Sequence, residues 1–202
     1  MNRIKDNTMN FIVEEATKLF LDKSIVSVTM SDIAKRVGIG EATLYRYFQK
    51  KQNIVMQSSV KLSKSVVETY FNLNTDTSGF TQLTSFYKAY EDIFSNHPDY
   101  FKFINELDAY IITENVSDKS EYETNINVYK EIFENAYKKG LSDNSVRKIE
   151  DISTFYYSTT HALLNLCKFL STKQAIEQSK EVKSSDEIKT LISIILAALK
   201  GE

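Results

Sequence analysis

The chain has 202 residues, of which 42% are hydrophobic and 26% are charged, and its formal net charge is −2. This length and composition predict a soluble protein of one or two domains with a sizeable core. The single cysteine, Cys167, excludes an internal disulfide framework and a cysteine-based zinc site. Neither a membrane-spanning run nor an apolar leader is expected, so we predict a cytoplasmic protein that needs no metal or cofactor.

The charges are unevenly distributed along the chain. Residues 1–64 contain 11 Lys and Arg against 6 Asp and Glu, whereas the remainder is acidic. A basic first third permits a nucleic-acid partner, but charge alone does not decide this, because many solvated faces are locally basic. Only 5 glycines and 1 proline occur in the chain, which favours long helices over sandwiches or barrels.

Three helices are expected in the first 50 residues. Apolar residues recur at helical period over 5–23, which predicts the first helix. A capping-box pattern, Thr29-Met-Ser-Asp32, begins a short second helix that Gly38 ends. A third, over 41–47, presents polar-tipped side chains.

Six further helices are predicted from the same periodicity, and the fold class is therefore all-α. Ser120-x-x-Glu123 and Ser184-x-x-Glu187 read as caps, and Gly140 reads as a left-handed helix end after two lysines. We predict no structure for residues 171–184. The six helices are expected at 51–73, 80–95, 98–114, 120–140, 146–170 and 184–200.

Two short helices joined by a glycine turn describe a helix-turn-helix. The segment TMSDIAKRVGIGEATLYRYFQKK, residues 29–51, resembles the DNA-binding signature of TetR-family transcriptional regulators. The resemblance implies a nine-helix architecture with a three-helix DNA-binding domain at 1–50 and an effector-binding and dimerisation domain at 51–202. Asn53-Ile54 departs from the family, which usually has an acidic residue followed by leucine there.

The resemblance also implies roles for individual residues. Tyr45, Tyr47 and Lys51 would contact phosphates, as would Thr29 or Ser31, and such contacts set register without reading sequence. Arg46 would read guanine or hold a phosphate, and Glu41 would accept from cytosine or favour the helix dipole. The expected DNA-binding residues are Thr29, Ser31, Gly40, Glu41, Ala42, Thr43, Tyr45, Arg46, Tyr47 and Lys51.

The last two predicted helices are apolar on more than one face. A helix of this kind is buried on both sides, either against a second copy of the chain or within a wholly internal pair. The family usually dimerises through these helices, and two DNA-binding helices about 34–36 Å apart, one from each copy, can bind the two halves of a palindrome. The expected interface residues are Ile152, Phe155, Leu163, Leu166, Leu191, Ile192, Ile195 and Leu199.

The middle helices are rich in aromatic residues. In the family such helices enclose a ligand pocket, whereas an aromatic stripe at helical spacing is more often core. Nearby carboxylates favour a neutral or cationic hydrophobic or aromatic effector over an anionic one. The expected pocket residues are Tyr87, Tyr90, Phe94, Phe103, Tyr110, Tyr129, Phe133, Tyr156 and His161.

The sequence thus predicts a DNA-binding transcriptional regulator, a ligand-responsive repressor that binds a palindromic operator as a homodimer. One alternative is a DNA-binding regulator controlled by a protein partner or by no effector. A distant alternative is a helical enzyme, but Cys167 and His161 lie six residues apart on poorly aligned faces of one predicted helix. No phosphate-cradling motif is present in the sequence.

Overall fold

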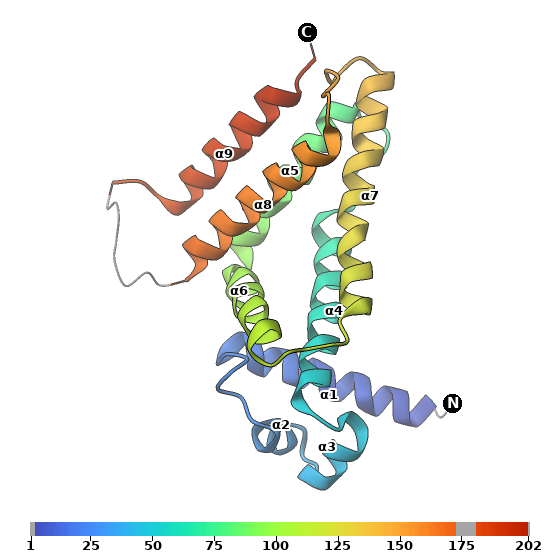
Figure 1. Ribbon diagram of the computed structural model, residues 1–202, viewed down its shortest axis with the longest axis vertical. Coiled ribbons are helices and arrows are strands. Elements are labelled where there is room, and N and C mark those ends of the chain that lie inside the picture. The colour runs from blue at the N-terminus through green and yellow to red at the C-terminus, as the bar shows by residue number, and fades with distance from the viewer. Residues whose placement is uncertain (1–2, 173–180, 202) are drawn as a thin grey trace. The chain divides into compact units, whose positions relative to one another are not determined.

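The computed structural model describes residues 3–172 and 181–201, and in these residues it contains nine α-helices and an isolated bridge between Val146 and Lys200 (Figure 1). The all-α prediction is confirmed. The helices are α1 (Arg3–Asp22), α2 (Met30–Val37), α3 (Glu41–Phe48), α4 (Lys51–Tyr70), α5 (Gly79–Asn96), α6 (Pro98–Thr113), α7 (Ser120–Ser142), α8 (Ile152–Ser171) and α9 (Ser184–Leu199). None of the described helices is long and apolar enough to cross a membrane.

The packing divides the chain into two compact units. Unit 1 comprises residues 3–65 and 102–125, and unit 2 comprises residues 66–101 and 126–201. Helices α4, α6 and α7 each contribute residues to both units. The expected functional boundary after residue 50 stays a prediction, because a packing unit and a functional domain are different quantities.

In unit 1, α1 packs against α2 and α2 packs against α3. The core of this trihelical part consists of fully buried apolar side chains, among them Ile12, Phe20, Ile33, Leu44 and Phe48. At the surface, Arg36 of α2 donates to Glu15 of α1 at 2.7 Å, which adds a polar tie between the two helices.

The short helix α2 is held at both ends. The Asp32 backbone N–H donates to the Thr29 hydroxyl at 3.1 Å, and the Thr29 N–H donates to the Asp32 carboxylate at 2.8 Å. This capping box confirms the predicted start. Gly38 ends the helix in the left-handed region at φ 79°, where a side chain would be strained.

Unit 2 is built on α5, α8 and α9, each of which packs against the other two. Its core is aromatic. The Phe86 ring lies 5.3 Å from Tyr87 and 5.6 Å from Phe133, and Phe133 lies 5.0 Å from Tyr156. These centroid distances are typical of favourable edge-on and tilted ring pairs.

Two predicted helix ends were wrong. Gly140 does not end a helix; α7 continues to Ser142. A Cβ on Gly140 would lie 2.3 Å from the Val146 side chain, so close packing explains this glycine. Helix α8 begins at Ile152 rather than 146, because the Arg147 N–H donates to the Leu199 carbonyl at 3.0 Å and holds the preceding segment extended.

The two serine caps also differ from expectation. Both Ser120 and Ser184 are the first residues of their helices rather than flanking caps. The Ser120 hydroxyl donates to Asp118 at 3.1 Å, and no side chain caps α9. Of the segment 171–184, for which no structure was predicted, residues 173–180 lie outside the described residues.

Candidate nucleic-acid interface

The structure places one face of α3 in solvent. Leu44 and Phe48 are buried, which fixes the rotation of this eight-residue helix about its axis. Of the residues expected to face base edges or phosphates, Thr43 and Tyr47 are half-buried. The others on this helix and its cap are exposed: Gly40, Glu41, Ala42, Tyr45 and Arg46.

The amino end of α3 is open. Its N-cap is Gly40, so no side-chain oxygen accepts from the first turn. Uncapped amide groups and the helix dipole leave partial positive charge at that end, which favours an approaching anion. A Cβ on Gly40 would meet nothing within 4 Å, so a partner has room to approach the backbone.

The two candidate phosphate contacts at α2 have different surroundings. The Thr29 hydroxyl donates to the Asp32 carboxylate at 2.6 Å. This hydrogen bond, together with the one from the Thr29 backbone N–H, lowers the pKa of the Asp32 carboxyl. Ser31 is exposed, and no partner is found for its hydroxyl among the described residues. Between these two, Ser31 has the free hydroxyl.

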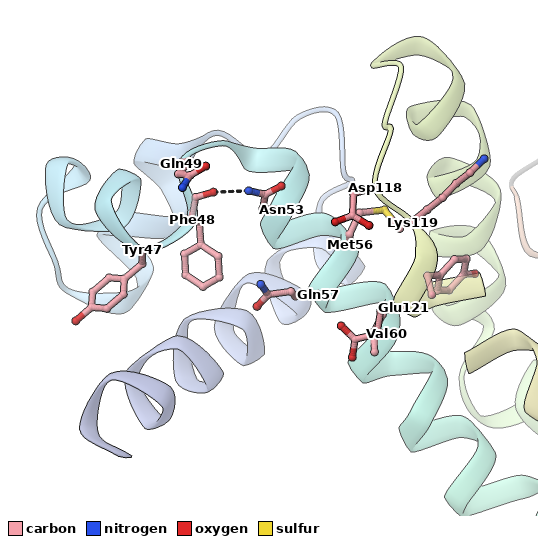
Figure 2. Close-up of a pocket in the computed structure, with 11 residues that line it drawn as sticks. Tyr47, Phe48, Gln49, Asn53, Met56, Gln57, Val60, Asp118, Lys119 and Glu121 are labelled. Carbon is pink, nitrogen blue, oxygen red and sulfur yellow. Dashed lines mark hydrogen bonds between the residues drawn. The ribbon is translucent and has the colours of Figure 1, made fainter. Parts of the chain in front are cut away.

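The two tyrosine side chains of α3 lie outside the buried face of the helix. Tyr45 is 47% exposed, and the Arg46 guanidinium lies 5.9 Å from the Tyr47 ring centroid, in cation–π range. Figure 2 shows the Tyr47 hydroxyl pointing away from Phe48 and from the α4 side chains. Both tyrosines therefore keep their hydroxyls available.

Sequence reasoning missed the joint between α3 and α4. The Asn53 amide donates to the Phe48 carbonyl at 2.8 Å, which satisfies an acceptor at the end of α3 (Figure 2). Gln49 occupies φ 63°, in the left-handed half of backbone space. Asn53, noted only as a departure from the family pattern, therefore fixes the end of the exposed helix against α4.

Lys51 is less accessible than expected. Its ammonium lies 3.4 Å from the Val26 carbonyl and 5.6 Å from the centroid of the Tyr110 ring. Burial lowers the pKa of Lys51, while the nearby Glu114 acts in the opposite direction. A phosphate contact by Lys51 stays a prediction, and it would require the side chain to turn from this position.

Two polar bonds within unit 1 connect α6 to the segments beside the exposed helix, and neither had a sequence signal. The Ile25 N–H donates to the Glu106 carboxylate at 2.8 Å, and the Gln52 amide donates to the Glu114 carbonyl at 3.1 Å. The partners are 81 and 62 residues apart in sequence. Periodicity within one helix cannot indicate such pairs.

A hollow of about 270 Å³ lies beside the end of α3 (Figure 2). Phe48, Gln57, Asp118 and Glu121 are among the residues that line it. It is smaller than typical small-molecule pockets, which measure about 300–1,000 Å³. Glu121 already pairs with Lys64 at 3.2 Å, so we assign no ligand to this hollow.

The expected effector-pocket residues belong to both units, and the pocket stays a prediction. Tyr87, Tyr90, Phe133 and Tyr156 are buried and pack ring against ring in unit 2. Burial raises the pKa of all three of these tyrosines. The remaining members have other surroundings: Phe94 and Tyr129 pack against that core, His161 is exposed, and Phe103 and Tyr110 belong to unit 1.

Four of the expected interface residues are buried in the core of unit 2, where α9 packs on α5 and α8. These side chains pack inside the single chain, and their part in a dimer interface stays a prediction: Leu163, Ile192, Ile195 and Leu199. The half-buried members of the set are Ile152, Phe155, Leu166 and Leu191. The structure adds exposed apolar side chains on the same two helices, at Tyr157, Phe169 and Ile194.

Catalytic chemistry has little support. Cys167 is buried, and burial raises the pKa of its thiol to about 12, which keeps it protonated. His161 is exposed and lies beside the Tyr157 ring at 5.6 Å. Among the described residues, no group of three or more His, Cys, Asp or Glu side chains is placed to hold a metal ion.

Comparison with known proteins decides the family. Residues 12–57, which span α1 to the first turns of α4, match the sequence pattern described as "Bacterial regulatory proteins, tetR family". The chain belongs to the TetR family. It is thus a helix-turn-helix transcriptional regulator, and regulators of this family bind DNA and act as dimers.

Relatives in Staphylococcus aureus agree with this assignment. The chain is 26% identical over 190 residues to the biofilm operon icaADBC negative transcriptional regulator IcaR, covering 92% of this chain and 97% of that protein. It is 28% identical over 138 residues to the HTH-type transcriptional regulator SAB2452, covering 67% and 68%.

A solved TetR-family structure supports the fold. The regulator from Mesorhizobium loti has a TM-score of 0.68 and 14% identity to this chain, with 99% of this chain and all of that chain covered. At this identity the likeness concerns the fold alone. The TetR-family regulators found in these comparisons are not enzymes.

Proposed function

We propose that this TetR-family regulator is a repressor that binds a palindromic operator as a homodimer. The observation that carries the proposal is the exposed face of α3. The opposite, apolar face of this helix is buried, while its amino end has no side-chain cap and its polar side chains face solvent. The negative regulation printed for IcaR supports repression over activation. Because DNA is the partner, the site of action is the cytoplasm.

Within this proposal, contacts divide into positioning and reading. Tyr45, Tyr47 and Ser31 donate hydroxyl hydrogens to phosphates, which sets the register of the protein on DNA. Glu41 and Arg46 stand on the exposed face where they can reach base edges. Thr29 keeps its hydroxyl in the capping box, so its contribution is to hold α2 in place.

The proposed dimer uses α8 and α9 through their outward faces. Tyr157, Phe169 and Ile194 are 43%, 45% and 61% exposed, although each carries a large apolar side chain. Burying such side chains against a second copy stabilises association by the hydrophobic effect. The half-buried Phe155, Leu166 and Leu191 belong to the same proposed face.

A neutral or cationic hydrophobic effector is retained as part of the proposal. The aromatic core of unit 2 is its candidate site, and a ligand there would have to separate rings that now contact one another. Control by a protein partner, or by no effector, is the alternative, and the close ring packing of that core favours it. A thermal-shift screen of neutral and cationic aromatic compounds separates the two.

Selection of DNA from a random pool tests the central claim. We expect a palindromic site, bound by a dimer. Tyr45→Phe and Thr43→Ala should each weaken that site, because each removes a hydroxyl that is expected to contact DNA. Tyr70→Phe, which removes a hydroxyl from a half-buried tyrosine in unit 2, is the matched control. Binding without a shared site, lost steeply with salt, would contradict the proposal.

A further inference from the structure

A second cavity in unit 1 has the features of a ligand site. It measures about 470 Å³, within the range of small-molecule pockets. Its lining comes from three segments: Lys50, Lys51 and Gln52 at and just before the start of α4; Ala109, Tyr110, Thr113 and Glu114 at and just after the end of α6; and Val26 from the link before α2. All three segments lie within unit 1, so their arrangement is part of one compact body.

The cavity has more positive than negative charge. Lys50 and Lys51 stand against one carboxylate, that of Glu114, which accepts from the Gln52 amide at 3.3 Å. In the part of the chain that the structure describes, neither lysine forms an ion pair. The Lys51 ammonium has the Val26 carbonyl at 3.4 Å and the Tyr110 ring at 5.6 Å as its neighbours.

The surroundings of Lys51 are unfavourable for an isolated cation. Its side chain is half-buried, and burial lowers the pKa of the ammonium. A half-buried charge gains most from a partner that is itself charged, because the local dielectric is low. An anionic oxygen in the cavity would supply that partner.

The rest of the lining is suited to an apolar body. Val26 is 75% exposed, and the Tyr110 ring and the Ala109 methyl group lie along the same cavity. Covering such surface removes it from water and adds affinity without charge. The cavity therefore combines a cationic end with an apolar wall.

We propose that this cavity binds a small amphiphilic anion, with a carboxylate or phosphate head on Lys51 and an apolar body against Val26, Ala109 and Tyr110. The consequence for regulation rests on the proposed function as a DNA-binding repressor and on the predicted contact between Lys51 and an operator phosphate. A phosphate contact requires the Lys51 side chain to turn from its position beside Val26 and Tyr110, so an anion that holds it there competes with DNA. This site is separate from the aromatic core of unit 2. Its proposed ligand is an anion, whereas the effector proposed for unit 2 is neutral or cationic.

The first test needs no DNA, so its failure is distinguishable from failure of the repressor proposal. Octanoate and octanamide have the same alkyl chain and differ in the head group, a charged carboxylate in the first and a neutral amide in the second. We expect calorimetry to show octanoate binding about tenfold more tightly, because a charge-assisted hydrogen bond is stronger than a neutral one. Equal binding of the two probes would overturn the proposal.

Three variants locate the site. Lys51→Met should remove the preference for octanoate, because it keeps the side-chain length and deletes the charge. Ala109→Trp should weaken both probes by filling the mouth of the cavity, while leaving operator binding unchanged. Lys64→Met is the control, since Lys64 lies on the same helix α4 and does not line the cavity.

Two further measurements complete the test. Amide chemical shifts on adding octanoate should move at residues 50–52 and 109–114, and shifts confined to other residues would overturn the site. In operator competition, octanoate should displace DNA at concentrations where inorganic phosphate does not. If phosphate displaces DNA equally well, Lys51 is a simple phosphate contact and the apolar wall has no role.

Discussion

The exposed face of α3 and the core of unit 2 are both rich in tyrosine, yet they use it in opposite ways. Tyr45 is 47% exposed, with its hydroxyl free to meet a partner. Tyr87 is fully buried, and its hydroxyl shares a hydrogen bond of 2.7 Å with Thr159. The comparison shows that a tyrosine in the sequence does not by itself indicate whether the side chain binds a partner or packs in the core. That depends on whether neighbouring helices cover the face on which the tyrosine lies.

The largest expected effect is on the buried side of this comparison. Phe133→Ala should lower the free energy of unfolding by about 3–5 kcal/mol, because it opens a cavity among contacting rings. Tyr45→Ala should change it by less than about 0.5 kcal/mol, since surface substitutions rarely do more. Urea denaturation measures both. A similar loss in the two variants would show that Tyr45 is a packing residue.

Two glycines sharpen the same contrast. A Cβ on Gly79 would lie 2.0 Å from the Gly140 nitrogen and 2.6 Å from the Ala136 carbonyl oxygen, and backbone atoms cannot turn aside. Gly79→Ala should therefore destabilise the protein by about 1–3 kcal/mol. Gly40→Ala meets open space, so its cost should be smaller, about 0.5–1 kcal/mol, because alanine is a poorer N-cap than glycine. Thermal unfolding of the two variants is the measurement.

The start of α2 separates stability from DNA binding. Thr29→Ala removes the cap from α2 and should cost about 1 kcal/mol in urea denaturation. Ser31→Ala should leave stability unchanged and weaken operator binding. The pKa of Asp32 is lowered from its ordinary 3.8, so the cap is complete above that pH and is lost as the pH falls below it. Were Ser31→Ala neutral for DNA binding, Ser31 would not be the phosphate contact.

A smaller effect is expected at high pH. Burial raises the pKa of Tyr110 from 10.0 to about 12, so the unfolded chain loses this proton first. Stability should therefore fall as the pH rises from 10 toward 12, because the unfolded state binds fewer protons. Tyr110→Phe should flatten part of that decline in the urea midpoint. An unchanged decline would assign it wholly to other groups, such as Tyr87.

Much of the amino-terminal region was predictable. The Thr29 and Asp32 cap and the Gly38 turn followed from local pattern, and the structure confirms both. Local rules suffice there because caps and turns involve residues three or four positions apart. The joint at Asn53 and the contacts of Glu106 could not be predicted, because their partners are set by packing.

The sequence by itself determined that the chain is helical, where the DNA-reading helix lies and which family it belongs to. Each of these depends on periodicity, capping and a contiguous motif, which are local properties. Only the tertiary structure decided which of two apolar faces on α9 is buried, why Gly140 lies inside a helix, and that Lys51 stands half-buried beside an open cavity. These depend on atoms brought together from distant segments, whose separation in sequence carries no local signal.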